Sequence, residues 1–175
     1  LVYEVFFQFH YESLRMPSVL GRIGLAWMLA AILYCHTGKK TQWGVAAGIL
    51  IGYFLLLKLV VAPDAPAGAD SLSKEGNIAF YIDRLLLPDN IYKPGVYDPE
   101  GILSTIPAVV TAMLGMFTGR YVKESPATGE RKTLNMLAAA IVMAIVAVVW
   151  AHWFPVIKKL WTSTFVLACG AWSIG

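Results

Sequence analysis

Long apolar runs alternate with polar intervals along this 175-residue chain. A run of about 20 apolar residues forms a helix roughly 30 Å long, which matches the hydrocarbon core of a bilayer. The pattern therefore predicts an all-α fold, a polytopic transmembrane helical bundle with about five spans in a single transmembrane domain. The expected spans lie near residues 19–35, 43–62, 102–121, 134–153 and 160–175.

One polar interval, residues 63–101, is much longer than the others. Its first part, Pro63 to Gly76, is rich in Pro, Ala, Gly, Asp and Ser, which marks an extramembrane loop. The segment Tyr81–Leu87 is apolar but too short to cross a bilayer, so we expect a short helix at the membrane surface. The triplet Asp98-Pro99-Glu100 has the arrangement of a helix start with Asp98 as the N-cap, leading into a span broken only at Pro107.

Small residues recur at helical spacing within several spans. Glycine stands at every fourth position in the second span, at Gly44, Gly48 and Gly52. Alanines form a similar line on the fourth span, at residues 140, 144, 147 and 151. Faces of this kind let a neighbouring helix backbone approach closely, within the bundle or in a homo-oligomer.

The overall composition is typical of an integral membrane protein that lies in a lipid bilayer. Hydrophobic residues make up 58% of the chain and charged residues only 14%, whereas soluble domains carry roughly a quarter charged residues. The formal charge is +3, but the lysines and arginines are scattered singly and in pairs, so nucleic acid is not an expected partner. Because the chain starts at Leu1 and stops in a hydrophobic run, we expect it to be a piece of a longer protein.

The loops predict an orientation. Basic residues concentrate in the short loops after the first and third spans, which the positive-inside rule places in the cytoplasm. The long loop 63–101 and the turn at Lys158 and Lys159 then face outward, and these two lysines run against the rule.

Five charged side chains are candidates for a polar site on the outer face, namely Asp83, Arg84, Asp98, Glu100 and Lys158. Carboxylates beside a cation can bind a polyhydroxylated or amine-bearing acceptor. The alternative is structural, with a capped helix and an Asp–Arg ion pair that holds the loop down. Arg22, one turn inside the first span, either reaches back to the headgroups or pairs with a carboxylate from a neighbouring segment.

The three histidines, His10, His36 and His152, are isolated, and there is no metal-ligand cluster in the sequence. His152 lies near the Lys158–Lys159 turn, where it would act as a base or would simply be an amphipathic side chain at the interface.

Four segments, Leu14–Gly24, Tyr81–Leu87, Tyr97–Pro107 and Pro155–Ser163, occur in the order and approximate spacing of a membrane acyltransferase family. In these segments the chain resembles the heparan-α-glucosaminide N-acetyltransferase-like family, as a bacterial member of the inner membrane. The resemblance implies transfer of acetyl from cytoplasmic acetyl-CoA to the amine of an amino sugar on the other side. It also places the family's active histidine in an earlier loop, so we transfer that role to none of the three histidines and expect this piece alone to be inactive.

Chemical reasoning is compatible with this activity. An N-acetyl transfer needs a neutral amine and donors for the tetrahedral oxyanion, and the outer charges would supply part of both. Basic cytoplasmic loops would attract the phosphates of CoA, although the positive-inside rule explains the same residues. Two other classes stay open: a transporter for a sugar or an acylated intermediate, which Pro107 alone favours, and a non-catalytic membrane scaffold.

Overall fold

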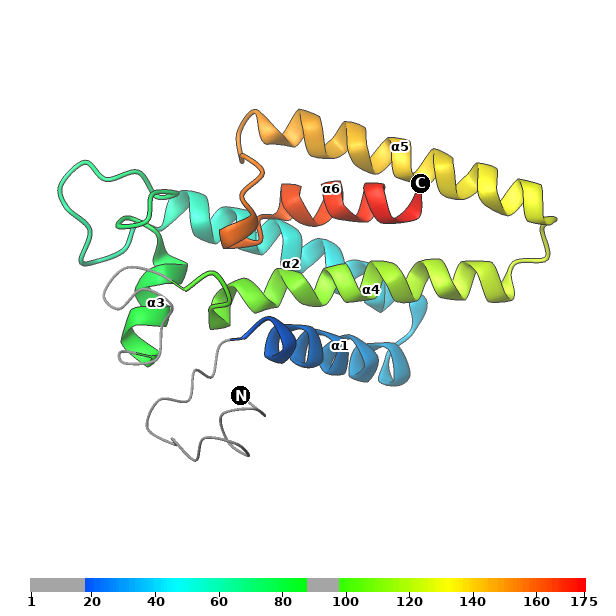
Figure 1. Ribbon diagram of the computed structural model, residues 1–175, viewed down its shortest axis with the longest axis horizontal. Coiled ribbons are helices and arrows are strands. Elements are labelled where there is room, and N and C mark those ends of the chain that lie inside the picture. Colours follow the sequence, from blue (N-terminus) through cyan, green and yellow to red (C-terminus); the bar gives the residue numbers. More distant parts are fainter. Residues whose placement is uncertain (1–17, 88–97) are drawn as a thin grey trace.

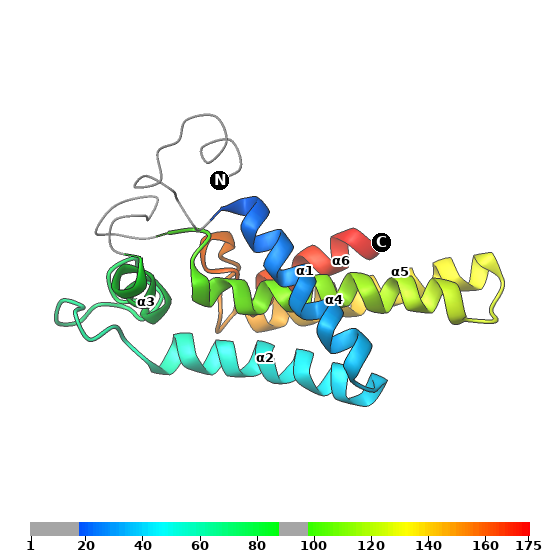
Figure 2. The same ribbon diagram turned by 90° about the horizontal axis from the view of Figure 1, so that it is seen from below.

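The computed structural model describes residues 18–87 and 98–175, and its secondary structure is helical apart from one β-bridge between Val61 and Asn77. Four helices are long and apolar enough to cross a membrane: α1 (Val19–His36), α2 (Lys39–Leu59), α4 (Ile102–Glu124) and α5 (Gly129–Ala151). Helices α2, α4 and α5 run along the long axis of the molecule, and α1 crosses α4 obliquely (Figures 1 and 2). The predicted all-α, multi-pass membrane bundle is confirmed.

Two shorter helices complete the described part. Helix α3 (Ile78–Leu86) is the short helix expected in the long loop, and it lies across one end of the bundle (Figures 1 and 2). After a single turn of 3₁₀ helix, η3 (Lys158–Leu160), helix α6 (Ser163–Ile174) packs between α4 and α5. With 12 residues, α6 is shorter than the roughly 20 that a span requires, so the fifth predicted span stays a prediction.

Helix α4 is the centre of the bundle and contacts α1, α2, α3 and α6. Small and medium side chains fill the shared core, including Ala30 of α1, Ala46 of α2, Val110 and Met113 of α4, and Val166 of α6. Close packing of such residues is the main source of helix association in a bilayer, where lipid is as apolar as the side chains. On α5, Ala140 and Ala147 are buried, and α6 is the helix that packs against α5 most extensively.

The glycine face of α2 is different. A Cβ atom built at Gly44, Gly48 or Gly52 would meet nothing within 4 Å in the described part of the chain. No described helix therefore makes the close approach that this spacing predicts.

Two expectations about α4 are wrong. The helix begins at Ile102 rather than at Pro99, and Gly101, not Asp98, occupies the N-cap position. The helix also continues without a break through Pro107. A proline so near the helix start removes only one backbone hydrogen bond, and the buried neighbours Ser104, Thr105 and Ala108 hold that turn in place.

The two basic turns lie at the same end of the molecule, as the predicted orientation requires. Lys39, at the start of α2, forms an ion pair of 2.8 Å with Glu124, at the end of α4. Helix α3 and the turn that carries Phe154 and Leu160 pack together at the opposite end (Figure 2). The cytoplasmic location of the basic end remains a prediction.

Candidate functional site at the start of α4

Four segments far apart in the sequence meet where α4 begins. Arg22 of α1 and Asp83 of α3 contact the stretch Pro99–Ser104, and Trp161, from the link between η3 and α6, lies against Arg22. These are the same four segments that carry the family resemblance. We call the site the α4 junction; it consists of Arg22, Asp83, Asp98, Glu100, Gly101, Ser104 and Trp161.

Arg22 fastens α1 to this site. The side chain is only 7% exposed, and its Nη2 donates hydrogen bonds to the carbonyl oxygen of Pro99 at 2.7 Å and to the hydroxyl of Ser104. The guanidinium carbon lies 4.9 Å from the centre of the Trp161 ring, which is within the range of a cation–π contact. Of the two alternatives for Arg22, the structure favours an inward, partnered guanidinium over one that reaches back to the headgroups.

Asp83 fastens α3 to the same site. Its Oδ1 accepts a hydrogen bond from the backbone N–H of Ile102 at 2.9 Å, and it therefore caps the first turn of α4 from another helix. The carboxylate lies against the Cα of Gly101, so closely that a Cβ atom there would collide with it. Glycine is therefore required at this position by contact, because its φ of −59° is ordinary for any residue.

Burial changes the acid–base behaviour of this carboxyl. Asp83 is 1% exposed, and desolvation raises its pKa to about 6. The nearby Asp98 adds to the rise, while the hydrogen bond from Ile102 and the charges of Arg22 and Arg84 oppose it. The proton on Asp83 is therefore held to a higher pH than an ordinary aspartic acid would allow.

Asp98 and Glu100 bring two further carboxyl groups. Asp98 is fully buried, and its Oδ1 accepts the backbone N–H of Glu100 at 2.8 Å, which closes a tight turn before the helix. Glu100 is half-buried, and its charge acts favourably on Arg22, together with those of Asp83 and Asp98. Three carboxyl groups thus act electrostatically on one guanidinium, and Glu100 is the most exposed of the three.

The turn between α5 and α6 is built to hold Trp161 in place. Trp161 has a left-handed backbone, with φ of 51°, and its Nε1 donates to the hydroxyl of Thr111 at 3.2 Å. Beside it, the buried hydroxyl of Thr162 donates to the carbonyl of Pro155 at 3.1 Å, and that of Ser163 donates to the carbonyl of Leu50 at 2.6 Å. The indole is consequently fixed to α4 and the turn to α2.

Two buried polar atoms at the junction have no hydrogen-bond partner among the described residues. One is a donor, the Nε of Arg22, and the other is an acceptor, the Oδ2 of Asp83. Buried polar groups are rarely left unpaired, because desolvation costs each of them about 1–3 kcal/mol. A hydroxyl-bearing ligand or a water molecule could satisfy either atom.

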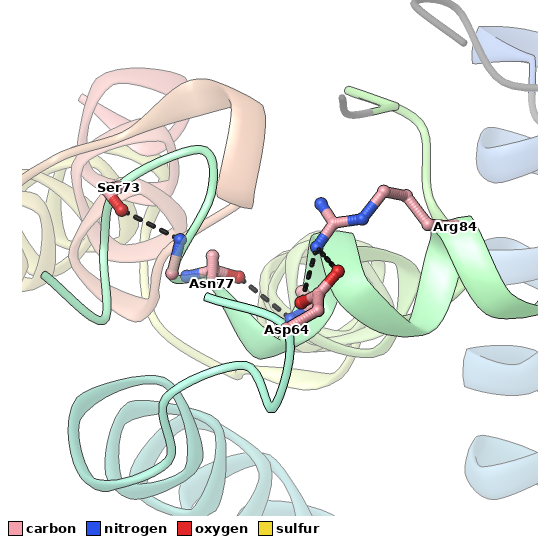
Figure 3. Close-up of polar contacts among 6 residues, drawn as sticks. Asp64, Ser73, Asn77 and Arg84 are labelled. Carbon is pink, nitrogen blue, oxygen red and sulfur yellow. Dashed lines mark hydrogen bonds and ion pairs between the residues drawn. The ribbon is translucent and has the colours of Figure 1, made fainter. Parts of the chain in front are cut away.

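The structure brings together three of the five predicted acceptor-side residues, Asp83, Asp98 and Glu100. Arg84 is elsewhere: its Nη2 contacts both carboxylate oxygens of Asp64, at 3.0 and 2.9 Å (Figure 3). This is the structural alternative of an Asp–Arg pair that holds the loop, with Asp64 as the acid. Lys158 is exposed on η3, and within residues 18–87 and 98–175 no hydrogen bond or ion pair joins its side chain to the junction.

The loop between α2 and α3 is ordered around that ion pair. Asn77 accepts a hydrogen bond from the N–H of Ala79 and so caps α3, while its Nδ2 donates to the carbonyl of Ser71. Ser73 accepts the N–H of Gly76 in the same loop (Figure 3). These bonds fix the start of α3 and thereby the position of Asp83.

Neither described histidine belongs to the junction. His36 ends α1 at the basic end, and His152 is an exposed residue that follows α5, with its Nδ1 near the carbonyls of Val148 and Val149. His10 lies outside the described residues. The amphipathic interpretation of His152 fits this placement.

Sequence reasoning missed Ser104 and Trp161 as members of the site. Both stand inside the segments that resemble the family, yet only the charged residues of those segments were selected as candidates. A sequence signal for Trp161 does exist: it is an aromatic residue two positions after the Lys158–Lys159 pair, in the short connection between two apolar runs.

Comparison with curated proteins supports a distant family relationship. The human heparan-alpha-glucosaminide N-acetyltransferase is 28% identical over 204 aligned residues, covering 89% of this chain and 31% of the human protein. The mouse protein of the same name is 27% identical over 214 residues, covering 94% of this chain and 33% of its own length. The chain thus spans about a third of the length of these relatives. No protein-family model matches it.

Proposed function

We propose that this distant relative of the heparan-alpha-glucosaminide N-acetyltransferases forms part of an integral membrane acyltransferase. In this proposal the complete protein, in a bacterial inner membrane, transfers acetyl from acetyl-CoA to the amine of an amino sugar across the bilayer. The observation that carries the proposal is the convergence of the four family-like segments on the α4 junction. Segments that only spanned lipid would have no reason to meet at one charged site.

Within this proposal, accessibility separates the roles of the junction residues. Asp83 and Arg22 are buried and hold α3 and α1 against the start of α4, so they act as positioning residues. Glu100 is only half-buried, and its carboxylate is the one best placed to bind the ammonium form of an acceptor amine. The group that removes the proton from that amine is expected in the part of the protein beyond this chain.

The opposite end of the bundle fits the donor side. Lys39, Arg120 and the neighbouring basic residues would attract the phosphates of CoA to the cytoplasmic surface. Donor and acceptor would then approach from opposite ends of the same helices, as a transfer across the membrane requires.

The test is an acetyl-transfer assay on the full-length protein in sealed liposomes. Acetyl-labelled CoA is supplied on one side and glucosamine on the other, with protein-free liposomes as the control. We expect labelled N-acetylglucosamine to form on the acceptor side only. Absence of transfer to every amino sugar tried, or a complete sequence without a histidine in an upstream loop between spans, would contradict the proposal.

A further inference from the structure

A groove runs between α2, α4 and α5 in the half of the bundle nearest the basic end. It encloses about 660 Å³, and its walls include Ala46 and Leu50 of α2, Val110 and Leu114 of α4, and Ala139 and Met143 of α5. On α4 it extends from Val110 to Tyr121, a helical rise of about 16 Å. That depth is close to one half of a hydrocarbon core about 30 Å thick, so the groove matches a single leaflet.

A second, charged cavity adjoins the groove at its basic end. This cavity, of about 470 Å³, is lined by Lys39, Arg120 and Glu124, and it shares the aromatic residues Trp43, Phe117 and Tyr121 with the groove. The rings of Trp43 and Phe117 lie 4.3 Å apart and mark the boundary between the two. An apolar channel with an aromatic rim and cations at its mouth has the polarity profile of an amphiphile that carries an anionic head.

The cations at the mouth exceed the nearby acids. The turns after α1 and α4 carry six lysines and arginines (Lys39, Lys40, Arg120, Lys123, Arg131 and Lys132) against two glutamates (Glu124 and Glu130). Arg120 is held in place because its guanidinium stacks at 4.0 Å on the ring of Tyr34 and its Nε donates to the Tyr34 hydroxyl. Arg120 therefore contributes a positioned cation to the lining of the charged cavity.

The interior of the groove favours a hydrocarbon chain over a ligand that carries polar groups. Its polar side chains are already bonded: the hydroxyl of Thr118 donates to the carbonyl of Leu114 at 2.9 Å, and Asn135 donates to the hydroxyl of Tyr121 at 2.6 Å. A ligand arm with amide groups would leave those amides without partners there, which is costly. An acyl chain has no such groups.

We propose that the groove binds one anionic phospholipid of the leaflet at the basic end, with an acyl chain between α2, α4 and α5 and the phosphate at Lys39 and Arg120. The lipid fills the gap that α5 leaves by packing on α6 rather than on α2. The lipid phosphate would use Lys39 and Arg120, the same cations that the proposed function offers to CoA, and the competition with acetyl-CoA described below distinguishes the two ligands.

The experiment is native mass spectrometry of the full-length protein released from nanodiscs that contain phosphatidylglycerol and phosphatidylcholine in equal amounts. We expect one phosphatidylglycerol to be retained, with a preference that falls on the order of tenfold in Lys39→Gln/Arg120→Gln. Arg120→Lys keeps the charge without the Tyr34 stack and should keep the preference. Lys58→Gln, at the opposite end of α2, is the matched control and should change nothing.

A second pair of variants tests the groove itself. Ala139→Phe fills it and should abolish retention of both lipids, whereas Val149→Phe, on an exposed face of α5 outside the groove, should not. Unchanged retention in Ala139→Phe would overturn the proposal. So would complete displacement of the lipid by acetyl-CoA, or cross-links from Ala139→Cys to another segment of the same protein, because each would identify a different occupant.

Discussion

The Oδ1 of Asp83 accepts the backbone N–H of Ile102 at 2.9 Å, so a residue of α3 caps the first turn of α4. The first N–H groups of any helix have no partner within the helix, and a carboxylate there also interacts favourably with the helix dipole. The cap is therefore both a local stabilisation of α4 and a connection between the surface loop and the membrane bundle.

Removing this cap should destabilise the protein. In Asp83→Ala the buried N–H of Ile102 loses its acceptor, and we expect a loss of about 1–3 kcal/mol in the free energy of unfolding. In Asp83→Asn the side-chain carbonyl can still accept that bond, so its stability should be no lower than that of the natural protein near pH 7. Thermal unfolding in detergent compares the two variants. Equal losses of stability in both would show that the hydrogen bond to Ile102 does not account for the stabilisation by Asp83.

The same carboxyl makes stability depend on pH. Because burial raises the pKa of Asp83 to about 6, above its ordinary value of 3.8, the folded protein binds this proton more tightly than the unfolded chain. The contribution is fully present below about pH 4, is lost as the pH rises through about 6, and amounts to on the order of 3 kcal/mol. Unfolding measured between pH 4 and pH 8 should show this decline, and Asp83→Asn should flatten it.

Gly101 should tolerate no side chain. Gly101→Ala places a methyl group against the Asp83 carboxylate, and we expect a loss of about 1–3 kcal/mol. Gly48→Ala is the matched control: its methyl group meets nothing within 4 Å in the described part of the chain, and it should stabilise α2 by about 0.5–1 kcal/mol. Adding Asp83→Ala to Gly101→Ala should cost less than the sum of the two single losses.

Arg22 should matter far more than Arg84. Arg22→Gln removes three hydrogen bonds from a buried charged donor and the contact with Trp161, so we expect a loss of about 2–4 kcal/mol. Arg22→Lys should recover only part of it, because an ammonium lacks the planar fork. Arg84→Gln breaks the pair with Asp64, whose side chain is 47% exposed, and should cost less than Arg22→Gln. Similar losses in both glutamine variants would contradict the assignment of the Arg22 contacts.

If the proposed acyl transfer is correct, substitutions of Glu100 and Lys158 should have different effects on KM. Glu100→Gln should raise KM for the amino-sugar acceptor about tenfold, equivalent to 1.4 kcal/mol of binding, with KM for acetyl-CoA unchanged. Lys158→Gln should leave both constants unchanged, because Lys158 is an exposed residue of η3. A fall in kcat alone for Glu100→Gln would assign it a structural role instead.

The four long helices were predictable because each apolar run is long enough to cross a bilayer, and in a bilayer such a run forms a helix. Spans expected near 19–35, 43–62, 102–121 and 134–153 correspond to α1, α2, α4 and α5, with ends that differ by a few residues. The start of α4 was not predictable, since its capping carboxylate stands 19 residues earlier. Local pattern assigned that role to Asp98, which instead closes a turn.

The composition of the site was predictable only in part. Charged residues beside apolar spans drew attention to Asp83, Asp98 and Glu100, and three-dimensional packing was needed to add Trp161 and to remove Arg84. Pro107, the feature that favoured a transporter, lies inside a continuous helix and no longer supports that class. The glycines of α2 have a spacing that predicts close helix packing, but no described helix packs closely on them. Such a spacing shows that a face can be packed against and does not identify the helix that does so.

The inward orientation of Arg22 has a consequence for biogenesis. Its hydrogen-bond partners at Pro99 and Ser104 stand 77 and 82 residues later in the chain. At a synthesis rate of about 5–20 residues per second, Arg22 leaves the ribosome roughly 4–16 s before those partners do. An arginine within a span is unfavourable for insertion by about 2.5–3.5 kcal/mol at the helix centre, and less near the end. Because Arg22 stands one turn inside α1, its guanidinium can stay at the level of the lipid headgroups after α1 is inserted. It can then move to its partners once α4 is inserted.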